Sequence, residues 1–599
     1  MSQHANANAD KVLISEVLDA TARAHGDQPA LKVKRGGLWQ THTWKEYREQ
    51  SRKVARGFIK LGLQPKQGVS IIGYNCPQWF FADVGGILAG GVPAGIYTTN
   101  SPDQCKYIAK HSDAAIAVVE DVKQLAKFKQ IWADLPCLQH VVLMYGSDPE
   151  ADPRVHSWEE LLDLGSQVPE SELDGRIAAQ NADDPCTLIY TSGTTGDPKA
   201  VMISHDNITW TAKAALQGMD LRMGDNTISY LPLSHVAEQV VSLHGPMLLG
   251  GCVWFAESID KLGENLREVR PHYFLGVPRV WEKIQAKIQA AGAQNTGIKK
   301  MISTWARAKG LEGGFALQKG EDLPPFFGLA NKLVFSKVRG LLGLDRCRIQ
   351  ITSAAPISRD TLEFFLSLGL PIFEVFGMSE CTGPATLSNA DLWETGKAGF
   401  VLPGGEMKIF PDGEICMRGR HVFKGYYKNP EATAEAIDGD GWLHSGDIGA
   451  IDDRGLLKIT DRKKDLLITA GGENIAPQVI EGELKAIPVV SQVVVVGDAM
   501  KYLAALITLD PEKVAQVAAA AGSSARDCAS AAKDDAFKKA LQKQIDEVNA
   551  KLAQVQTIKR WVIIAGEFTI EGGELTPTMK IKRKVVREKY AQEIAALYN

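Results

Sequence analysis

Short apolar runs alternate with helical patterns over most of this 599-residue chain, and this alternation restricts the fold more than any other feature. Such an arrangement is typical of α/β domains whose sheets are largely parallel. Because ligands of such sheets bind at the carboxyl ends of the strands, loops that follow strands are candidate binding sites. Apolar runs lie at 69–73, 115–119, 140–144, 186–190, 252–255, 348–352 and 372–376, and helical patterns include 79–88 and 279–291.

The pattern changes near Gly404, where turn sequences such as Pro411-Asp-Gly413 become dense. Short strands linked by such turns indicate a small antiparallel β-subdomain. A charged segment then precedes a compact α+β tail. A chain of this length is too long to fold around a single hydrophobic core, so at least two domains are expected. We therefore expect an N-terminal domain at 1–460, a hinge at 461–465 and a C-terminal domain at 466–599. A merely solvated connector is an equal alternative for the hinge.

Composition excludes several classes of function. The net charge of −4 gives no basic footprint for nucleic acid, so no nucleic-acid partner is expected. Nine cysteines without C-x-x-C pairs suggest neither zinc nor disulfides, and they are typical of reduced thiols in a cytoplasmic protein. No apolar stretch is long enough to span a bilayer, and the start of the chain lacks a signal-peptide core. The sequence does not indicate an oligomeric state.

One segment leaves peripheral contact with the inner face of a membrane as an alternative to a purely cytoplasmic location. Residues 329–344 mix apolar side chains with Lys332, Lys337 and Arg339. The pattern favours a surface helix that packs its apolar face on the core over a helix that contacts lipid.

The loop Tyr190-Thr-Ser-Gly-Thr-Thr-Gly-Asp-Pro-Lys199 combines hydroxyls, two glycines and a lysine directly after an apolar run. Glycines let backbone N–H groups approach an anion, and the hydroxyls and Lys199 add donors and charge. An ordinary turn is the plain alternative. The P-loop pattern G-x-x-x-x-G-K-[ST] fails, because Gly193 and Gly196 are too close and Ala200 follows the lysine. We interpret the loop as a grip for the phosphates of ATP.

This loop resembles the phosphate-binding signature of the adenylate-forming superfamily, which includes acyl-CoA synthetases, luciferases and peptide-synthetase adenylation domains. The resemblance runs over most of the chain. It implies that ATP, Mg²⁺ and coenzyme A are used. Phosphate contacts would come from Lys199 and from Thr191, Ser192, Gly193, Thr194, Thr195 and Gly196.

Further motifs extend the resemblance to the rest of the nucleotide. Phe376-Gly-Met-Ser-Glu380 resembles a family motif in which Phe376 stacks on adenine, Gly377 and Met378 follow it, and Ser379 touches a phosphate. Glu380, with the Thr191 hydroxyl, would hold Mg²⁺, which prefers hard oxygen ligands. The family more often has Tyr at the position of Phe376. Ala354 lies in a small-residue turn that would admit adenine, and Asp447 with Arg462 would bind the ribose hydroxyls. A turn role is the alternative for Asp447.

The resemblance also assigns the catalytic groups, which are Lys580, Lys199 and Glu380. Lys580 would bridge the carboxylate and the α-phosphate during adenylation, although a solvated basic run is the plain alternative. Lys464 falls at the hinge position of the family. After adenylation the C-terminal domain would rotate, and Gly471 and Gly472 would line a channel for the CoA thiol.

Residues 231–239 and 276–281 resemble the long-chain acyl-CoA synthetase branch, close to bacterial and bubblegum-type members. His235 would then lie at the mouth of the acyl pocket, and a structural role is its alternative. The expected function is ATP-dependent conversion of a long-chain fatty acid to acyl-CoA through an acyl-adenylate. Two rivals are an acyl-AMP ligase that loads a carrier protein and a nucleotide-binding regulatory protein without catalysis. The regulatory protein would be expected to lose Lys580 or Glu380.

Overall fold

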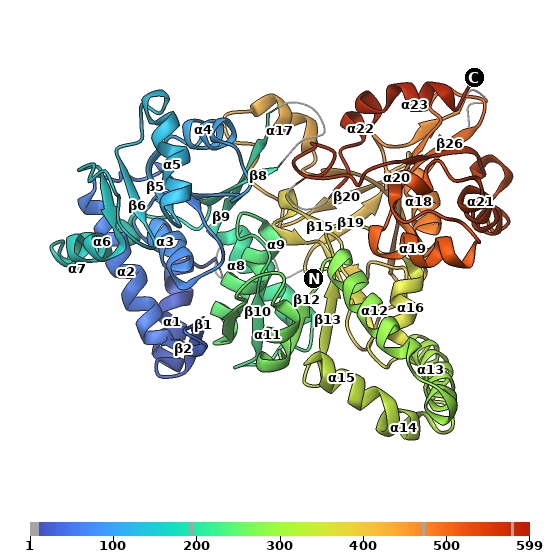
Figure 1. Cartoon of the computed structure of the whole chain (residues 1–599). Coiled ribbons are helices and arrows are strands. Elements are labelled where there is room, and N and C mark those ends of the chain that lie inside the picture. The colour runs from blue at the N-terminus through green and yellow to red at the C-terminus, as the bar shows by residue number, and fades with distance from the viewer. Residues whose placement is uncertain (1–10, 192–196, 470–473, 577–579) are drawn as a thin grey trace.

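A seven-stranded sheet forms the first layer of the protein in this computed structural model, which describes residues 11–191, 197–469, 474–576 and 580–599 (Figure 1). Its strand order is β7-β6-β5-β3-β4-β8-β9, and only the β8–β9 pair is antiparallel. Ile71 and Ile72 lie in different hydrophobic clusters, so both faces of the sheet are covered. The strands are β3 (Gly68–Ile72), β4 (Val92–Ile96), β5 (Ala114–Val119), β6 (His140–Leu143), β7 (Val155–Ser157), β8 (Pro185–Thr191) and β9 (Lys199–Ser204).

Two smaller sheets complete the α/β part. One has the order β10-β11-β1-β2, and the other has the parallel order β12-β13-β14. The largely parallel α/β fold expected from the sequence is thereby confirmed. The strands are β1 (Pro29–Arg35), β2 (Leu38–Thr43), β10 (Asn226–Ser229), β11 (Cys252–Phe255), β12 (Tyr273–Leu275), β13 (Ile349–Thr352) and β14 (Ile372–Glu374). Helices that pack on these sheets include α1 (Ile14–His25), α2 (Trp44–Lys60), α3 (Pro77–Leu88), α4 (Pro102–His111), α5 (Val122–Ile131), α8 (His205–Gly218), α12 (Pro278–Ala293) and α16 (Arg359–Leu366).

A four-stranded antiparallel sheet follows, as the dense turns predicted. Its order is β19-β20-β21-β22. The last strand continues to Arg462, so the first two residues of the predicted hinge pair within this sheet. The Asp461 carboxylate accepts a hydrogen bond from the Gln478 N–H at 3.2 Å, at the start of α18 (Pro477–Lys485). The strands are β19 (Glu406–Ile409), β20 (Glu414–Arg418), β21 (Leu443–Ile451) and β22 (Leu457–Arg462).

The C-terminal part has its own hydrophobic core. Its two clusters of buried residues begin at Leu467, and the clusters of the preceding part end at Leu457 among the described residues. The core is built on the sheet β25-β26-β27, which mixes an antiparallel and a parallel pair. The elements are β25 (Val490–Val496), β26 (Leu503–Leu509), β27 (Ile558–Ile564), α19 (Pro511–Ala520), α20 (Cys528–Ala531), α21 (Asp535–Asn549), α22 (Arg583–Lys589) and α23 (Ala591–Ala596). The exact domain limits stay a prediction.

Arg583 links α22 to the hinge and to α18. Its guanidinium donates to Glu481 at 2.5 and 2.8 Å and lies 3.4 Å from Asp465. Arg583 and Glu481 are both largely buried, so each charge depends on the other. These contacts set the start of α22, and with it the segment that carries Lys580.

A helical arm projects from the body of the protein near the third sheet, at the lower right of Figure 1. It consists of α13 (Gly297–Gln318), α14 (Phe327–Ala330), the π-helical turn η3 (Asn331–Phe335) and α15 (Ser336–Leu342). No helix in the described part of the chain is both long and apolar enough to cross a membrane.

Candidate active site

The predicted phosphate loop is flanked by two paired strands. Thr191 ends β8 and lies opposite Lys199, which begins β9, and the Thr191 hydroxyl donates to the Lys199 carbonyl at 3.4 Å. The Lys199 ammonium lies 4.8 Å from the centroid of the Tyr426 ring. An aromatic face attracts an ammonium without occupying its hydrogen-bond donors, so these donors can still contact an anion. Ser192, Gly193, Thr194, Thr195 and Gly196 lie outside the described residues, as do Gly471 and Gly472.

Glu380 lies in a buried single turn, η4 (Ser379–Cys381), directly after β15 (Gly377–Met378). The Tyr426 hydroxyl donates to its Oε1 at 2.8 Å. Burial raises the pKa of Glu380, whereas the Tyr426 hydroxyl and the ammonium groups of Lys199 and Lys580 act in the opposite direction. The two lysines that the sequence assigned to catalysis therefore lie within electrostatic reach of this carboxylate.

Asp447 and Arg462 face each other across neighbouring strands. They are register partners in β21 and β22, and Arg462 Nε lies 3.3 Å from Asp447 Oδ1. Burial raises the pKa of Asp447, and the charges of Arg462 and Lys580 partly offset this effect. The structure thus brings together the two residues predicted to hold the ribose, and it adds Lys580 to them.

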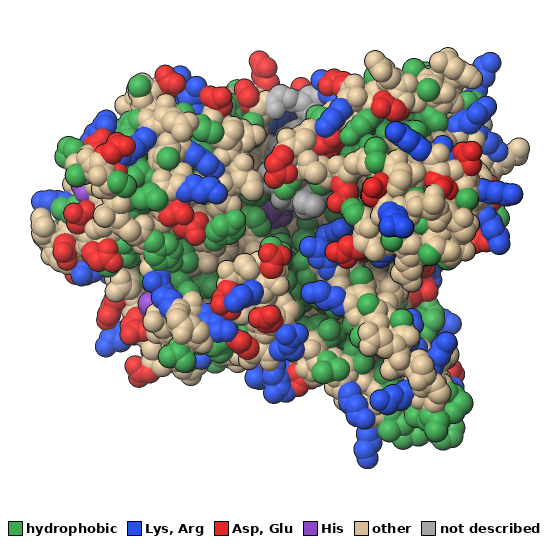
Figure 2. Space-filling model, viewed as in Figure 1, with side chains coloured by type: hydrophobic (Ala, Val, Ile, Leu, Met, Phe, Trp, Pro, Cys, Tyr) green, Lys and Arg blue, Asp and Glu red, His purple; other side chains and the backbone are tan. Residues whose placement is uncertain are grey.

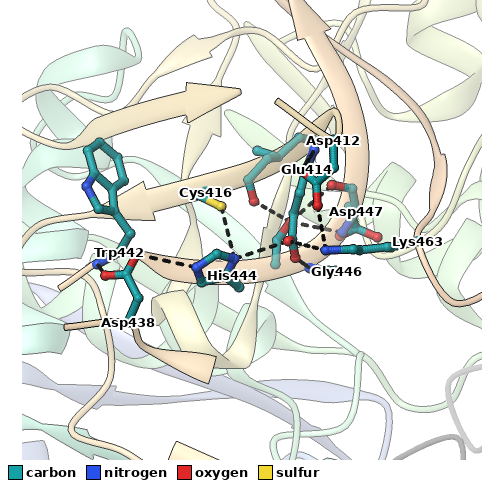
Figure 3. Close-up of polar contacts among 11 residues, drawn as sticks. Asp412, Glu414, Cys416, Asp438, Trp442, His444, Gly446, Asp447 and Lys463 are labelled. Atoms are coloured by element: carbon teal, nitrogen blue, oxygen red, sulfur yellow. Dashed lines mark hydrogen bonds and ion pairs between the residues drawn. The ribbon is translucent and has the colours of Figure 1, made fainter. Parts of the chain in front are cut away.

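A polar network fixes the strand that carries Asp447 (Figure 3). The Glu414 carboxylate accepts from the Gly446 N–H at 2.9 Å and from Lys463 Nζ at 2.9 Å, and it lies 3.1 Å from His444 Nδ1. Burial opposes the ionised form of Glu414, but Lys463, His444 and Gly446 together lower its pKa. Since Gly446 immediately precedes Asp447, this network holds the backbone that presents the Asp447 carboxylate.

Glu414, Cys416 and His444 are also close enough together to hold a metal ion. However, the Glu414 oxygen nearest to His444 already accepts from the Lys463 ammonium, which also binds Asp412 at 2.7 Å. The positive charge that a metal would bring is therefore already supplied, and we interpret the cluster as a charge network.

Lys580 comes from the C-terminal part and completes the site. Its backbone N–H donates to the Thr576 hydroxyl at 3.0 Å, and its carbonyl accepts from the Thr576 N–H at 2.8 Å. Burial first, and the Arg462 charge second, lower the pKa of Lys580 to about 8, whereas Asp447 and Glu380 raise it. Asp447 and Glu380 do not fully offset the effect of burial on this ammonium, so the site favours an additional anion beside it.

His235 lies within electrostatic reach of Lys580. It caps α9 (Val236–Glu238), where its Nδ1 accepts from the Ala237 N–H at 3.2 Å, so the neutral ring carries its proton on Nε2. Burial first, and the charge of Lys580 second, lower the pKa of His235 to about 4. The ring is therefore uncharged near neutral pH. A place at the acyl-pocket mouth stays a prediction.

The predicted adenine segment shows two backbone constraints. Ala354 has a left-handed φ of +76°, which is strained for any residue with a Cβ. A Cβ on Gly377 would meet the Gly383 carbonyl oxygen at 1.8 Å, so only glycine fits there. Phe376 precedes this glycine and is 7% exposed, and its N–H donates to the Thr386 hydroxyl at 3.2 Å. Contacts of Phe376, Gly377, Met378 and Ser379 with a nucleotide stay predictions.

Two residues near the site were missed in the sequence. Tyr426 contacts both Lys199 and Glu380, and Lys463 holds the network under Asp447. Tyr426 lies in the run Lys424-Gly-Tyr-Tyr-Lys428, where glycine beside two aromatic residues was the available signal. Lys464, which was assigned to the hinge, is exposed.

Comparison with known families places this geometry in context. The chain matches the family model described as AMP-binding enzyme over residues 18–427, and the AMP-binding enzyme C-terminal domain over 464–599. It is 45% identical to "Long-chain-fatty-acid--CoA ligase ACSBG2" of Xenopus laevis, covering 99% of this chain and 84% of that protein. It is 41% identical to "Long-chain-fatty-acid--CoA ligase ACSBG1" of Rattus norvegicus, covering 96% of this chain and 84% of that protein.

Solved structures share the fold at low sequence identity. The anthranilate CoA ligase AuaEII in complex with anthranoyl-AMP superposes with a TM-score of 0.74 at 18% identity, covering 98% of each chain. ATP-bound MatB from Rhodopseudomonas palustris gives a TM-score of 0.70 at 21% identity, covering 96% of this chain and 99% of that one. With two family models that together span most of the chain and relatives above 40% identity, the protein belongs to the AMP-binding, adenylate-forming enzyme family.

Proposed function

We propose that the protein activates a long-chain fatty acid with ATP and transfers the acyl group to coenzyme A. The observation that carries the chemistry is the meeting of Lys580, Glu380 and Asp447 from separate parts of the chain. The choice of acid rests on the relatives named as long-chain-fatty-acid--CoA ligases, which match nearly the whole chain. They give no support to the carrier-loading alternative.

In the first half-reaction a carboxylate oxygen of the acid attacks the α-phosphorus of ATP. A new P–O bond forms, the bond to pyrophosphate breaks, and an acyl-adenylate results. Lys580 would neutralise charge that develops on the α-phosphate, and Lys199 would hold the phosphates. Positioning and charge stabilisation supply most of the rate in such phosphorus chemistry.

Glu380 is the residue that fits Mg²⁺ in this half-reaction. It is a buried carboxylate beside two lysines, and a hard oxygen of this kind suits Mg²⁺ shared with substrate phosphates. The Thr191 hydroxyl would be a second oxygen ligand. When bound, the ion neutralises phosphate charge.

In the second half-reaction the thiol of coenzyme A attacks the acyl carbonyl, the C–S bond forms, and AMP leaves. Lys580 has no role in this step, so the C-terminal part is free to rotate about the hinge and admit the thiol. Gly471 and Gly472 would line its path. The proposal places this reaction in the cytoplasm, with fatty acid and coenzyme A as partners.

The test is AMP release from ATP across a series of fatty-acid lengths, each with and without coenzyme A. AMP release that requires both a long-chain acid and coenzyme A, with matching acyl-CoA, is the expected result. Build-up of adenylate that is discharged by a carrier protein but not by coenzyme A would replace the proposal with the carrier-loading alternative.

A further inference from the structure

The outer face of the helical arm, residues 297–342, concentrates exposed apolar side chains. Eight of the large hydrophobic residues exposed in the described part of the chain lie there, although the arm is a small fraction of the sequence. Figure 2 shows hydrophobic side chains gathered at the tip of this projection, with Lys and Arg at its sides. The eight residues are Ile298, Met301, Leu317, Leu323, Phe326, Leu329, Leu333 and Leu341.

This exposure does not result from loose packing. The arm has its own small core of Ala306, Ala330 and Phe335. Gly310 lets α13 approach the end of α16 so closely that a Cβ at this position would meet the Ser367 carbonyl oxygen at 2.1 Å. Small residues and Phe335 thus fill the inner face, and the eight large hydrophobic residues are exposed. The surface-helix interpretation of residues 329–344 accounts for Phe335 but not for these outward residues.

Phe326 makes the outward placement specific. It is 67% exposed, and it adopts a left-handed φ of +68° at the start of α14. This conformation is a genuine outlier for a bulky residue and costs on the order of 1–2 kcal/mol. A solvent-facing loop has no packing reason to keep both an exposed aromatic ring and a strained backbone.

Charge identifies what would cover this face. The arm carries eight Lys or Arg residues against three acidic ones, whereas the whole chain has a net charge of −4. A second copy of the chain is disfavoured, because a symmetric contact would set two basic faces together. An apolar face flanked by ammonium groups matches a bilayer that contains anionic lipid. The exposed lysines are Lys299, Lys300, Lys319, Lys332 and Lys337.

We propose that the outer face of the helical arm is a docking surface for an anionic lipid bilayer. The apolar side chains would enter the interfacial layer while the lysines contact lipid phosphates. The inference deepens the proposed function, because a long-chain fatty acid partitions into membranes and a docked enzyme would meet it there. Lipid binding is measured without turnover, so its failure and the failure of the proposed function are distinguishable.

The test is flotation of the full-length protein with vesicles of phosphatidylcholine, with or without about one quarter phosphatidylglycerol. We expect binding to the anionic vesicles that weakens as salt is raised. The double variant Phe326→Asn, Leu329→Ser should lower the partition coefficient about tenfold or more. Asparagine tolerates the left-handed backbone, so this variant does not add strain. Lys332→Gln with Lys337→Gln should also lower binding about tenfold.

Leu38→Ser is the matched control, since Leu38 is 75% exposed on β2, away from the arm. It should bind vesicles like the unaltered protein. No variant should melt at a lower temperature than the unaltered protein, and all should keep the same turnover of detergent-dispersed fatty acid. Absence of vesicle binding by the unaltered protein would overturn the proposal. Equal binding by the arm variants, or equal loss in Leu38→Ser, would also overturn it.

Discussion

ATP binding is expected to bring a proton onto Lys580. The pKa of this ammonium is lowered to about 8 in the free site, mainly by burial. The shift corresponds to about 3 kcal/mol of destabilisation of the charged form. At pH 9 only about a tenth of the free enzyme carries this charge, whereas at pH 7 about nine-tenths does. Phosphate charge beside Lys580 should return its pKa toward the ordinary value. Uptake should therefore be about 0.8 proton per ATP at pH 9 and about 0.1 at pH 7.

Isothermal titration calorimetry measures this uptake directly. ATP is titrated without fatty acid at pH 9, where its phosphates are already fully ionised, in two buffers of different ionisation enthalpy. The difference in observed heat gives the number of protons bound. Lys580→Met should abolish the uptake, and Lys582→Met is the neighbouring control that should retain it. Absence of proton uptake by the unaltered protein at pH 9, or equal uptake by Lys580→Met, would show that Lys580 is not the group that gains the proton.

Three further outcomes follow from the site and its supports. Glu380→Gln should lower kcat/KM for Mg·ATP about a hundredfold, whereas Tyr426→Phe should lower it only a few-fold, since it removes one neutral donor. Steady-state kinetics at varied Mg²⁺ measures both effects, and equal effects would contradict the role of Glu380 as the metal ligand. Ala354→Gly should stabilise the protein by about 1 kcal/mol by relieving the left-handed strain, and an unchanged melting temperature would contradict this. Arg583→Met should destabilise the C-terminal part by about 3–5 kcal/mol, because the buried Glu481 carboxylate loses its opposite charge and keeps the hydrogen bond from the Val495 N–H; chemical denaturation measures this loss.

Much of the fold could be predicted because its signals are local. Fully buried strands such as β3 and β5 were visible as short, mostly apolar runs, and the turns after Gly404 indicated the antiparallel sheet. The hinge stays a prediction, and the continuation of β22 through Asp461 and Arg462 could not be told from the sequence. Strand ends set by pairing with a distant neighbour leave little trace in local composition.

Residues of the candidate site could be proposed from the sequence where a motif resembled that of a family, but the aromatic residue that supports them could not. Lys580, Glu380 and Asp447 were assigned from the family resemblance and their roles stay predictions, whereas their mutual proximity was visible only in the fold. Tyr426 was missed because tyrosine in a loop has many ordinary roles. The sequence singled out residues 329–344 but could not show which of its leucines are exposed, since apolar periodicity does not tell which face meets a neighbour.

The central claim is that Lys580 serves adenylation and not thioester formation. It is tested most directly by measuring both half-reactions in Lys580→Ala, namely acyl-adenylate formation from ATP and acyl-CoA formation from supplied acyl-adenylate. The account predicts a loss of adenylate formation of about a thousandfold or more, with thioester formation changed only a few-fold. An equal loss of both half-reactions would contradict it.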